Sequence, residues 1–367
     1  PAAAPAAGRG AQRRVAVVGG GVTGATCALE LLRRGSGRVA VTVFDQGRLL
    51  GGRCGHRRVL ESGEYAGADA PAAAFLFDHG CQFFRADSPR FRRELLQEWL
   101  DRGWAAPWAC RFGALPGPAH AAGAPADFFG APAQLPVYCG VGGMSALPAG
   151  ILGEVAALGA QVRPGVRVAA MHRLSSGAWL LSGTTGKAAL HDTKEEEAAR
   201  VSPDCLGEFD VVIVTDVSAS MAAWHRASAG VPEAIAARVR TRARVALFTA
   251  LFAFEARVEV PLDAISFADE TLWFAARTSS KPGLGGAATL DCWTLVSTPK
   301  YAAAEIERVP MQDPVTGAFR PQEMPYLREG PCAELLAAFA RALRAAGHGE
   351  PPRAAYVGGQ RWGSACP

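Results

Sequence analysis

The sequence predicts an α/β protein in which a parallel sheet with flanking helices is interleaved with a second domain built on an antiparallel sheet. Two observations lead to this prediction. Near the N-terminus, the apolar run VAVV (residues 15–18) enters a glycine-rich turn, and a helical apolar pattern follows, which is the order of a strand, a turn and a helix. Farther along, four β-like segments succeed one another between residues 244 and 297, which indicates an antiparallel sheet.

The glycine-rich turn has a spacing with a known physical purpose. Gly19, Gly21 and Gly24 follow the pattern G-x-G-x-x-G, and the next strand ends in Asp45. The first glycine permits a tight turn, the second lets a pyrophosphate approach the backbone, and the third lets the helix pack closely on the strand. The helix N-terminus attracts phosphate, and Asp45 suits ribose hydroxyls. The sequence therefore predicts a Rossmann-type dinucleotide-binding domain, with a purely structural turn as the alternative.

Two downstream segments point to one dinucleotide. Residues 44–55 read FDQGRLLGGRCG, and residues 77–84 read FDHGCQFF. Together they resemble the FAD-binding half of the flavin amine-oxidase superfamily. The resemblance implies that Gly52 and Arg53 lie along the FAD, with Arg53 near the pyrophosphate. It also implies that the turn containing His79 passes close to the isoalloxazine ring.

Within the superfamily, the chain looks most like the renalase-like branch. Besides the FDHGCQFF segment and the helical pattern after it, the matching segments are 136–152, 208–224, 290–306 and 358–367. The resemblance thus runs from about Arg14 to the end. In that family, a Gly-Asp strand and a helix follow the R-W segment and close over the flavin. The chain stops soon after Arg361 and Trp362, so we expect the C-terminal FAD segment to be lacking.

The G-x-G-x-x-G pattern with Asp45 and the resemblance to the superfamily together give the candidate cofactor-binding residues. These are Gly19, Gly21, Val22, Thr23, Gly24, Asp45, Gln46, Gly52, Arg53, His79, Gly80, Gln82 and Val168. The resemblance places Val168 against the adenine. For His79, a contact with the flavin and a simple role in the turn are both open.

Two aromatic residues are the candidates for shaping a flat catalytic pocket. The resemblance turns Trp293 toward the flavin face, and Phe83 is the second choice, with core packing as the alternative for each. Trp362 is the third aromatic candidate. Arg361 would bind an anionic substrate or the flavin, or form a structural ion pair.

The resemblance implies FAD as the cofactor and the oxidation of dihydronicotinamides, either NAD(P)H or its isomers. Hydride would pass to flavin N5, with O2 as the final acceptor. We find no Ser/His/Asp set and no carboxylate pair in the sequence, as expected for hydride transfer. One alternative is a flavin amine oxidase, which would need an aromatic cage and a lysine near N5. Lys281 and Lys300 are the candidates, in unconvincing contexts. The other alternative is a non-catalytic flavin-binding fragment.

The composition of the chain indicates which classes of binding partner to expect. The net charge is only +4, and just four of the 38 basic residues are lysine, which argues against a nucleic-acid partner. The apolar run at residues 245–254 is far shorter than the roughly 20 residues that span a bilayer. We therefore expect a small-molecule substrate and O2 as partners, and no membrane span. The oligomeric state is left open.

The cysteine pattern and the N-terminal residues indicate in which cellular compartment the protein is expected. Nine cysteines are scattered without a C-x-x-C pair, so we expect buried thiols in a reducing compartment and no metal site. Residues 1–13 lack the apolar core of a secretory signal and are expected to be a disordered tail, with the end of a transit peptide as the alternative. These features predict a soluble protein of the cytoplasm or an organelle, plastids included.

The expected domain boundaries follow from these segments. Residues 14–87, 136–175, 205–225 and 353–367 would form the FAD-binding domain, and 88–135 with 226–352 the substrate domain. Within them we expect a helix over 88–102, a loop over 103–133, a strand over 209–215 buried on both faces, and an amphipathic helix over 330–347.

Overall fold

The computed structural model describes residues 12–60, 62–65, 75–115, 136–185, 204–284, 290–310 and 323–366. The chain divides into two compact units, each made from two stretches of sequence. The first unit contains residues 1–52 and 148–242, and the second contains 53–147 and 243–367. Residues 1–11 of the predicted tail, and residues 116–133 of the predicted loop, lie outside the described residues.

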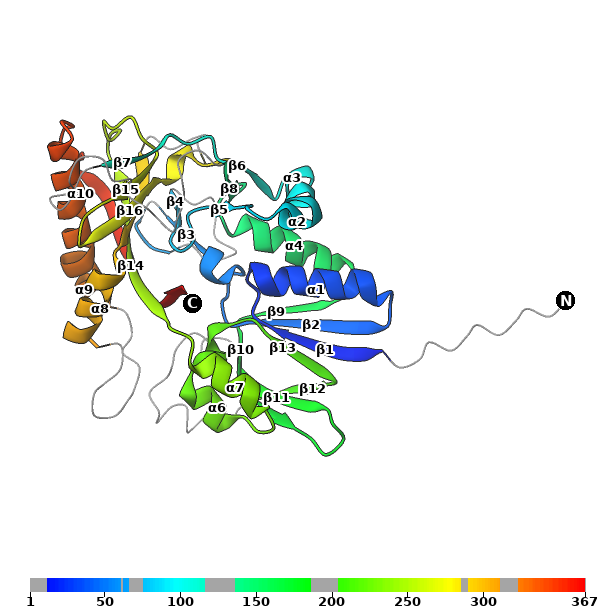
Figure 1. Ribbon diagram of the computed structural model, residues 1–367. Coiled ribbons are helices and arrows are strands. Elements are labelled where there is room, and N and C mark those ends of the chain that lie inside the picture. The colour runs from blue at the N-terminus through cyan, green and yellow to red at the C-terminus, as the bar shows by residue number, and fades with distance from the viewer. Residues whose placement is uncertain are drawn as a thin grey trace. The chain divides into compact units, whose positions relative to one another are not determined.

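The first unit is built on a four-stranded parallel sheet with the order β13-β1-β2-β9 (Figure 1). Its strands are β1 (Arg13–Val18), β2 (Val39–Asp45), β9 (Gln161–Pro164) and β13 (Val211–Val214). Helix α1 (Val22–Gly35) follows β1 and connects it to β2. This strand order is that of the first half of a Rossmann fold. The predicted α/β fold of this region is therefore confirmed.

A second layer packs on this parallel sheet. It is the antiparallel sheet of β10 (Val166–Arg173), β11 (Trp179–Thr185) and β12 (Asp204–Phe209). The two sheets share one hydrophobic core, in which Phe44 of β2 meets Phe209 edge to face at 5.8 Å. The remaining helical segments of the unit are α4 (Ala146–Ala157), which begins in the second unit, η4 (Val217–Ser220), α6 (Ala222–Ala227) and α7 (Glu233–Arg240).

The second unit contains a six-stranded sheet with the order β18-β14-β17-β16-β15-β7. Its strands are β7 (Phe112–Leu115), β14 (Val245–Phe254), β15 (Ala264–Phe267), β16 (Leu272–Arg277), β17 (Asp291–Ser297) and β18 (Ala354–Cys366). All its neighbouring strands are antiparallel except β7, which pairs parallel to β15. The apolar run at 245–254 forms β14, so the predicted antiparallel sheet is confirmed.

One face of this sheet is covered by helices, as Figure 1 shows for α10 and its neighbours. These are α8 (Pro299–Arg308), α9 (Met324–Leu327), the π-helical η6 (Arg328–Cys332) and α10 (Ala333–Ala345). The expected amphipathic helix over 330–347 is thus present as part of η6 together with α10. Its apolar side buries Leu335, Phe339 and Leu343 in the core of the unit.

The rest of the second unit consists of short elements. The strands are β3 (His56–Val59), β4 (Phe75–Asp78), β5 (Phe84–Arg85), β6 (Ala105–Pro107) and β8 (Val137–Gly140). The turns η1 (Gly52–Cys54), which begins in the first unit, and η5 (Thr278–Ser280) accompany them. The expected helix over 88–102 is α2 (Pro89–Phe91), the π-helical η2 (Arg92–Leu96) and α3 (Gln97–Asp101) in succession. Ser88 caps it by accepting the Phe91 N–H at 3.4 Å.

Residues 53–87, 136–147 and 353–367, which were expected in the FAD-binding domain, lie in the second compact unit, where β18 pairs with β14 along its length. Residues 226–242, which were expected in the substrate domain, lie in the first unit. Two other expectations need correction. The expected loop over 103–133 contains β6 and β7 in its described part. The strand at 211–214 is half-buried, since β13 lies at the edge of its sheet.

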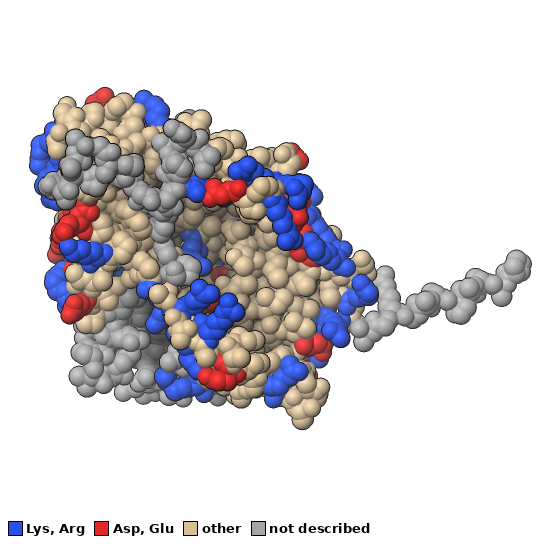
Figure 2. Space-filling model, in the orientation of Figure 1, with Lys and Arg blue, Asp and Glu red and all other residues tan. Residues whose placement is uncertain are grey.

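Charges on the visible face are mixed (Figure 2). Over the α2–η2–α3 helix, Arg90 pairs with Glu94 at 2.8 Å and Arg102 with Glu98 at 3.9 Å, so cations there lie beside anions. Among the described residues, no helix has the length and apolar character needed to cross a bilayer.

Candidate functional site

The glycine turn of the first unit has the geometry that its spacing predicts. Gly19 adopts a φ of +111°, which L-residues rarely adopt. A Cβ on Gly24 would lie 1.8 Å from the carbonyl oxygen of Gly19, so only glycine lets α1 pack this close to the end of β1. A Cβ on Gly21, in contrast, would have only the Gly51 oxygen nearby, at 3.7 Å. The space above Gly21 is therefore open to a ligand.

Asp45 fastens the glycine turn to the end of β2. Its carboxylate accepts the Gly20 N–H at 2.5 Å and the Gly47 N–H at 2.7 Å. The side chain is buried, and burial raises the pKa of this carboxyl despite the two backbone hydrogen bonds. Each oxygen keeps a further lone pair for a ribose hydroxyl. The neighbouring candidate Gln46 is exposed, as is Thr23, whereas Val22 is half-buried.

Two residues at the same sheet edge were not predicted from the sequence. Thr215 follows β13 and donates to the carbonyl oxygen of Val18 at 3.0 Å. Asp216 is next, and burial raises the pKa of its carboxyl. Both lie against Gly19, whose Cβ would meet Thr215 Oγ1 at 2.5 Å. The signal was present in the sequence, because polar residues directly after a parallel strand lie at the edge of the sheet where ligands bind.

In the second unit, the D-H-G-C-Q turn is held by a buried ionic cluster. Lys281 Nζ lies 2.8 Å from Asp78 Oδ2 and 3.1 Å from Gln82 Oε1, and the Lys281 and Asp78 side chains are fully buried. Asp78 Oδ1 accepts the Met144 N–H at 2.8 Å. Gln82 Nε2 donates to the carbonyl oxygens of Asp78 at 2.6 Å and Gly80 at 2.9 Å. Lys281 is therefore a structural partner of this turn.

His79 stacks on Trp362, with ring centroids 5.1 Å apart and planes 13° apart. The carbonyl oxygen of His79 accepts from Trp362 Nε1 at 2.8 Å and from Thr249 Oγ1 at 2.9 Å. The ring Nδ1 of His79 is buried and, within the described part of the chain, has no hydrogen-bond partner. Burial holds the pKa of His79 well below its usual range, with the positive charge of Arg57 acting in the same direction. His79 is therefore a neutral imidazole at pH 7.

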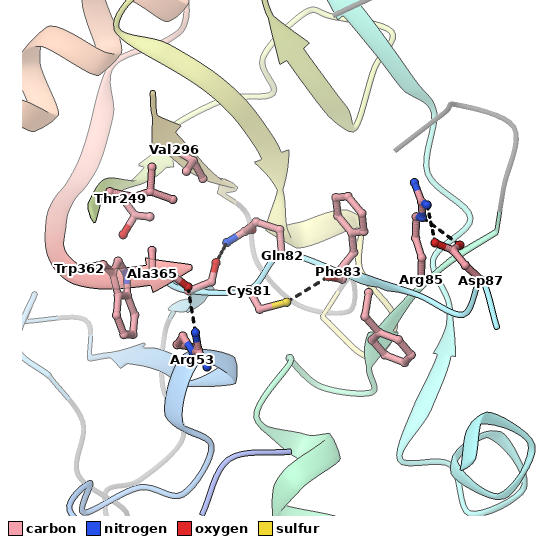
Figure 3. Close-up of a pocket in the computed structure, with 13 residues that line it drawn as sticks. Arg53, Cys81, Gln82, Phe83, Arg85, Asp87, Thr249, Val296, Trp362 and Ala365 are labelled. Atoms are coloured by element: carbon pink, nitrogen blue, oxygen red, sulfur yellow. Dashed lines mark hydrogen bonds and ion pairs between the residues drawn. The ribbon is translucent and has the colours of Figure 1, made fainter. Parts of the chain in front are cut away.

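A pocket of about 360 Å³ opens beside this turn, entirely within the second unit (Figure 3). That volume lies in the range of small-molecule sites. Aromatic and aliphatic side chains make up about half of the lining residues, and charged and polar side chains lie among them. The lining residues are Arg53, Gly80, Cys81, Gln82, Phe83, Phe84, Arg85, Asp87, Leu247, Thr249, Val296, Trp362 and Ala365.

Trp293 is not among the lining residues. It is fully buried, donates from Nε1 to Asp291 at 2.9 Å, and packs on Phe339 of α10 at 5.4 Å. Successive strand residues face opposite sides of a sheet. Trp293 therefore faces the helices, whereas Thr294 donates to the carbonyl oxygen of Asp78 at 3.1 Å and Val296 lines the pocket. This placement does not fit the expected position of Trp293 at the flavin face.

The same alternation separates the two residues at the end of the R-W segment. Trp362 pairs with Leu247 and lines the pocket. Arg361 pairs with Phe248 and is buried, with Nη1 3.4 Å from the carbonyl oxygen of Val309. Arg361 therefore has a structural setting away from the pocket.

The remaining candidates fall into separate places. Phe83, Arg53, Gly80 and Gln82 line the pocket of the second unit. Gly52 is exposed at the end of the first unit. The side chain of Val168 is buried in the core of the first unit, at a bulge of β10.

Comparisons with known proteins agree with this fold. A family profile described as an NAD(P)-binding Rossmann-like domain matches residues 17–99. A proposed protoporphyrinogen oxidase from Exiguobacterium sp. 255-15 has a TM-score of 0.57 at 10% identity, over 96% of this chain and 87% of that one. A reduced UDP-galactopyranose mutase has a TM-score of 0.59 at 10% identity, over 96% and 83%.

A third solved structure is similar over nearly the whole chain. It is a putrescine oxidase variant with redesigned cofactor binding, with a TM-score of 0.54 at 13% identity, over 97% of this chain and 89% of that one. A search of curated protein sequences finds no match. At these identities the similarity shows a shared fold over nearly the whole chain.

The burial of His79 predicts a pH dependence of stability. Its folded pKa lies below the ordinary value of 6.5, so the unfolded chain takes up a proton first as the pH falls. Stability is then fully present above pH 6.5 and is lost below it, by at most about 1.4 kcal/mol per pH unit for this group. We expect His79→Phe, which keeps the ring on Trp362, to reduce that loss between pH 6.5 and pH 5.

Urea unfolding at several pH values measures this dependence. The control is His172→Phe at an exposed position. An unchanged slope in the His79→Phe protein would show that His79 does not titrate differently on folding.

Proposed function

We propose that this protein is an FAD-dependent oxidoreductase that oxidises dihydronicotinamides, NAD(P)H or its isomers, with O2 as the final acceptor. The observation that carries the proposal is the open space above Gly21 at the carboxyl end of β1, next to a buried acid at the end of β2. That arrangement suits a dinucleotide pyrophosphate and its ribose. The resemblance of the G-G-R and D-H-G segments selects FAD among dinucleotides.

The residues of the first unit fit the dinucleotide part of FAD. Gly21 is the N-cap of α1, and the first turn of this helix holds no acidic side chain that would repel a phosphate. Asp45 is positioned by two backbone N–H groups and would accept ribose hydroxyls through its remaining lone pairs. Val168 lies next to a bulge of β10, and the resemblance places it against the adenine.

The pocket of the second unit fits a planar heteroaromatic ring. Phe83 and Trp362 offer flat apolar surfaces, and Gln82 and Thr249 line the pocket with side chains that are bonded to the turn. Arg53 adds a positive charge suited to a phosphate-bearing molecule. When bound, FAD would supply a hydride acceptor and then pass two electrons to O2 to give peroxide. The side chains of the pocket would orient a flat ring, exclude water and neutralise phosphate charge.

A flavin amine oxidase is the second candidate, and one observation favours it. Lys281 is buried and bonded to Gln82, which lines the pocket, so a lysine lies one side chain from that cavity. Against this candidate, the Lys281 ammonium is bound to Asp78 and is not itself a lining residue. The exposed Lys300, 72% accessible and paired with Glu270, has no comparable setting.

Anaerobic reduction of the bound flavin tests the proposal. The FAD-loaded protein would be mixed with a set of dihydronicotinamide isomers or with a set of primary amines, and loss of the visible flavin band would be recorded. We expect rapid bleaching by at least one dihydronicotinamide and none by amines. Phe83→Leu should slow the bleaching by about tenfold, because hydride transfer needs the donor held at about 3–3.5 Å.

The matched control is Phe112→Leu, at a ring 6.0 Å from Phe83 that does not line the pocket. It should bleach as fast as the parent. Bleaching by amines alone would instead support the second candidate. A protein that binds FAD but is bleached by neither class would be a non-catalytic flavin-binding protein.

A further inference from the structure

Two cysteines meet at the edge of the pocket. Cys54 ends η1, two residues before β3, and Cys81 follows β4, the antiparallel partner of β3. The Cys81 N–H donates to the carbonyl oxygen of Arg53 at 2.8 Å, which continues this pairing beyond the strands. The Cys54 and Cys81 thiols lie close enough to interact, and neither is joined in a disulfide. Cys81 Sγ donates to the carbonyl oxygen of Phe83 at 3.0 Å. Cys81 also lines the pocket (Figure 3).

The surroundings of the two thiols differ in a way that assigns them different roles. The contact with Cys54 lowers the pKa of the Cys81 thiol, and the Lys281 ammonium acts in the same direction, whereas burial and the charge of Asp78 oppose this lowering. The same contact, together with burial, raises the pKa of Cys54. Cys81 is thus the better nucleophile, and Cys54 is the protonated partner beside it. A thiolate reacts with peroxides, whereas a thiol reacts slowly.

We propose that Cys54 and Cys81 form a peroxide-reactive thiol pair at the pocket wall. Cys81 sulfur attacks one oxygen of hydrogen peroxide, the O–O bond breaks, and Cys81 becomes a sulfenic acid as water leaves. Cys54 sulfur then attacks Cys81 sulfur, the S–O bond breaks, and a second water leaves. In sum, two thiols and one peroxide give one disulfide and two waters. The thiols lose two electrons and the peroxide gains them.

The pair would change the pocket that it borders. A Cys54–Cys81 bond would tie η1 to the D-H-G-C-Q turn, and Arg53, the middle residue of η1 and part of the pocket wall, would be held with it. If the peroxide that oxidises the two cysteines is the product of the enzyme's own reaction, this part of the inference rests on the proposed function. The reactivity of the thiol pair itself does not, because added peroxide would oxidise it equally.

The test is peptide mapping under non-reducing conditions after treatment of the whole protein with one equivalent of hydrogen peroxide. We expect a cross-linked pair of peptides containing Cys54 and Cys81, and a fall of two in the titratable thiols of the nine-cysteine chain. Dithiothreitol should reverse both changes. In Cys54→Ser, oxidation should stop at a sulfenic acid on Cys81 that dimedone labels. Cys205→Ser, at an exposed cysteine, should still form the cross-link.

The buried Cys139 and Cys292 serve as internal standards, because burial raises the pKa of each thiol. Cys81 should react at least about tenfold faster than either. The absence of a Cys54–Cys81 cross-link in the parent protein, or oxidation of Cys81 no faster than that of Cys139, would overturn the inference without any variant. A further arm replaces added peroxide with dihydronicotinamide turnover, with and without catalase. Cross-linking by added peroxide alone would count against the proposed oxidase activity and leave the thiol pair supported.

Discussion

Replacing Gly21 with valine is expected to weaken FAD binding by about 100-fold or more, which is roughly 2.7 kcal/mol, while the free protein stays as stable as the parent. The backbone of Gly21 is extended, with φ of −76°, so valine adopts it without strain. A Cβ there has only the Gly51 oxygen nearby, at 3.7 Å. The added side chain therefore fills the space of the ligand and not that of the fold. FAD titration of the apoprotein, with its melting temperature, measures both quantities.

Gly24→Ala is the matched control in the same turn. Its Cβ would lie 1.8 Å from the Gly19 oxygen, so α1 must move away from β1. This variant should lose stability without ligand as well as binding. If Gly21→Val retained full FAD affinity, the pyrophosphate would have to bind elsewhere, and the proposed cofactor site would be wrong.

Replacing Lys281 with methionine should produce the largest loss of stability. The Lys281–Asp78 pair is fully buried, so removal of the cation leaves a buried carboxylate without its partner. Breaking a buried pair in this way costs about 3–5 kcal/mol. Urea unfolding, followed by fluorescence, measures the change. Adding Asp78→Asn to Lys281→Met should recover at least half of the loss, because the amide removes the charge but still accepts the Met144 N–H.

Lys300→Met is the control for this prediction. Its partner Glu270 lies at 2.7 Å, but both side chains are more than 70% exposed. Exposed pairs contribute about 0.2–1 kcal/mol, so this variant should be close to the parent. Equal losses at Lys281 and Lys300 would show that the buried cluster does not hold the D-H-G-C-Q turn.

The glycine turn was predictable from sequence because its determinants are local. The order of strand, turn and helix and the spacing of Gly19, Gly21 and Gly24 lie within one short segment, and the structure has the same local order. The β14 strand was also predicted from a local feature, the ten-residue apolar run at residues 245–254.

The pocket was less predictable because it depends on strand orientation and on contacts between distant residues. The sequence predicts the alternation along β17 but not which face meets the helices, so a place at the flavin face and core packing were both open for Trp293, which packs on Phe339 of α10. Lys281 and Asp78 are 203 residues apart and meet only through the fold. A lysine in a loop sequence gives no sign that it will be fully buried.

The pairing of β1 also constrains how the chain emerges from the ribosome. One edge of β1 can pair with β2 almost at once, but the other waits for β13, whose Val211 pairs with Val15. At translation rates of about 5–20 residues per second, that edge stays open for roughly 10–40 seconds. An open apolar edge is a template for pairing with other chains. We therefore expect the nascent protein to be most prone to aggregation before residue 211 leaves the exit tunnel, and a slower stretch of translation upstream of β13 to lower the yield.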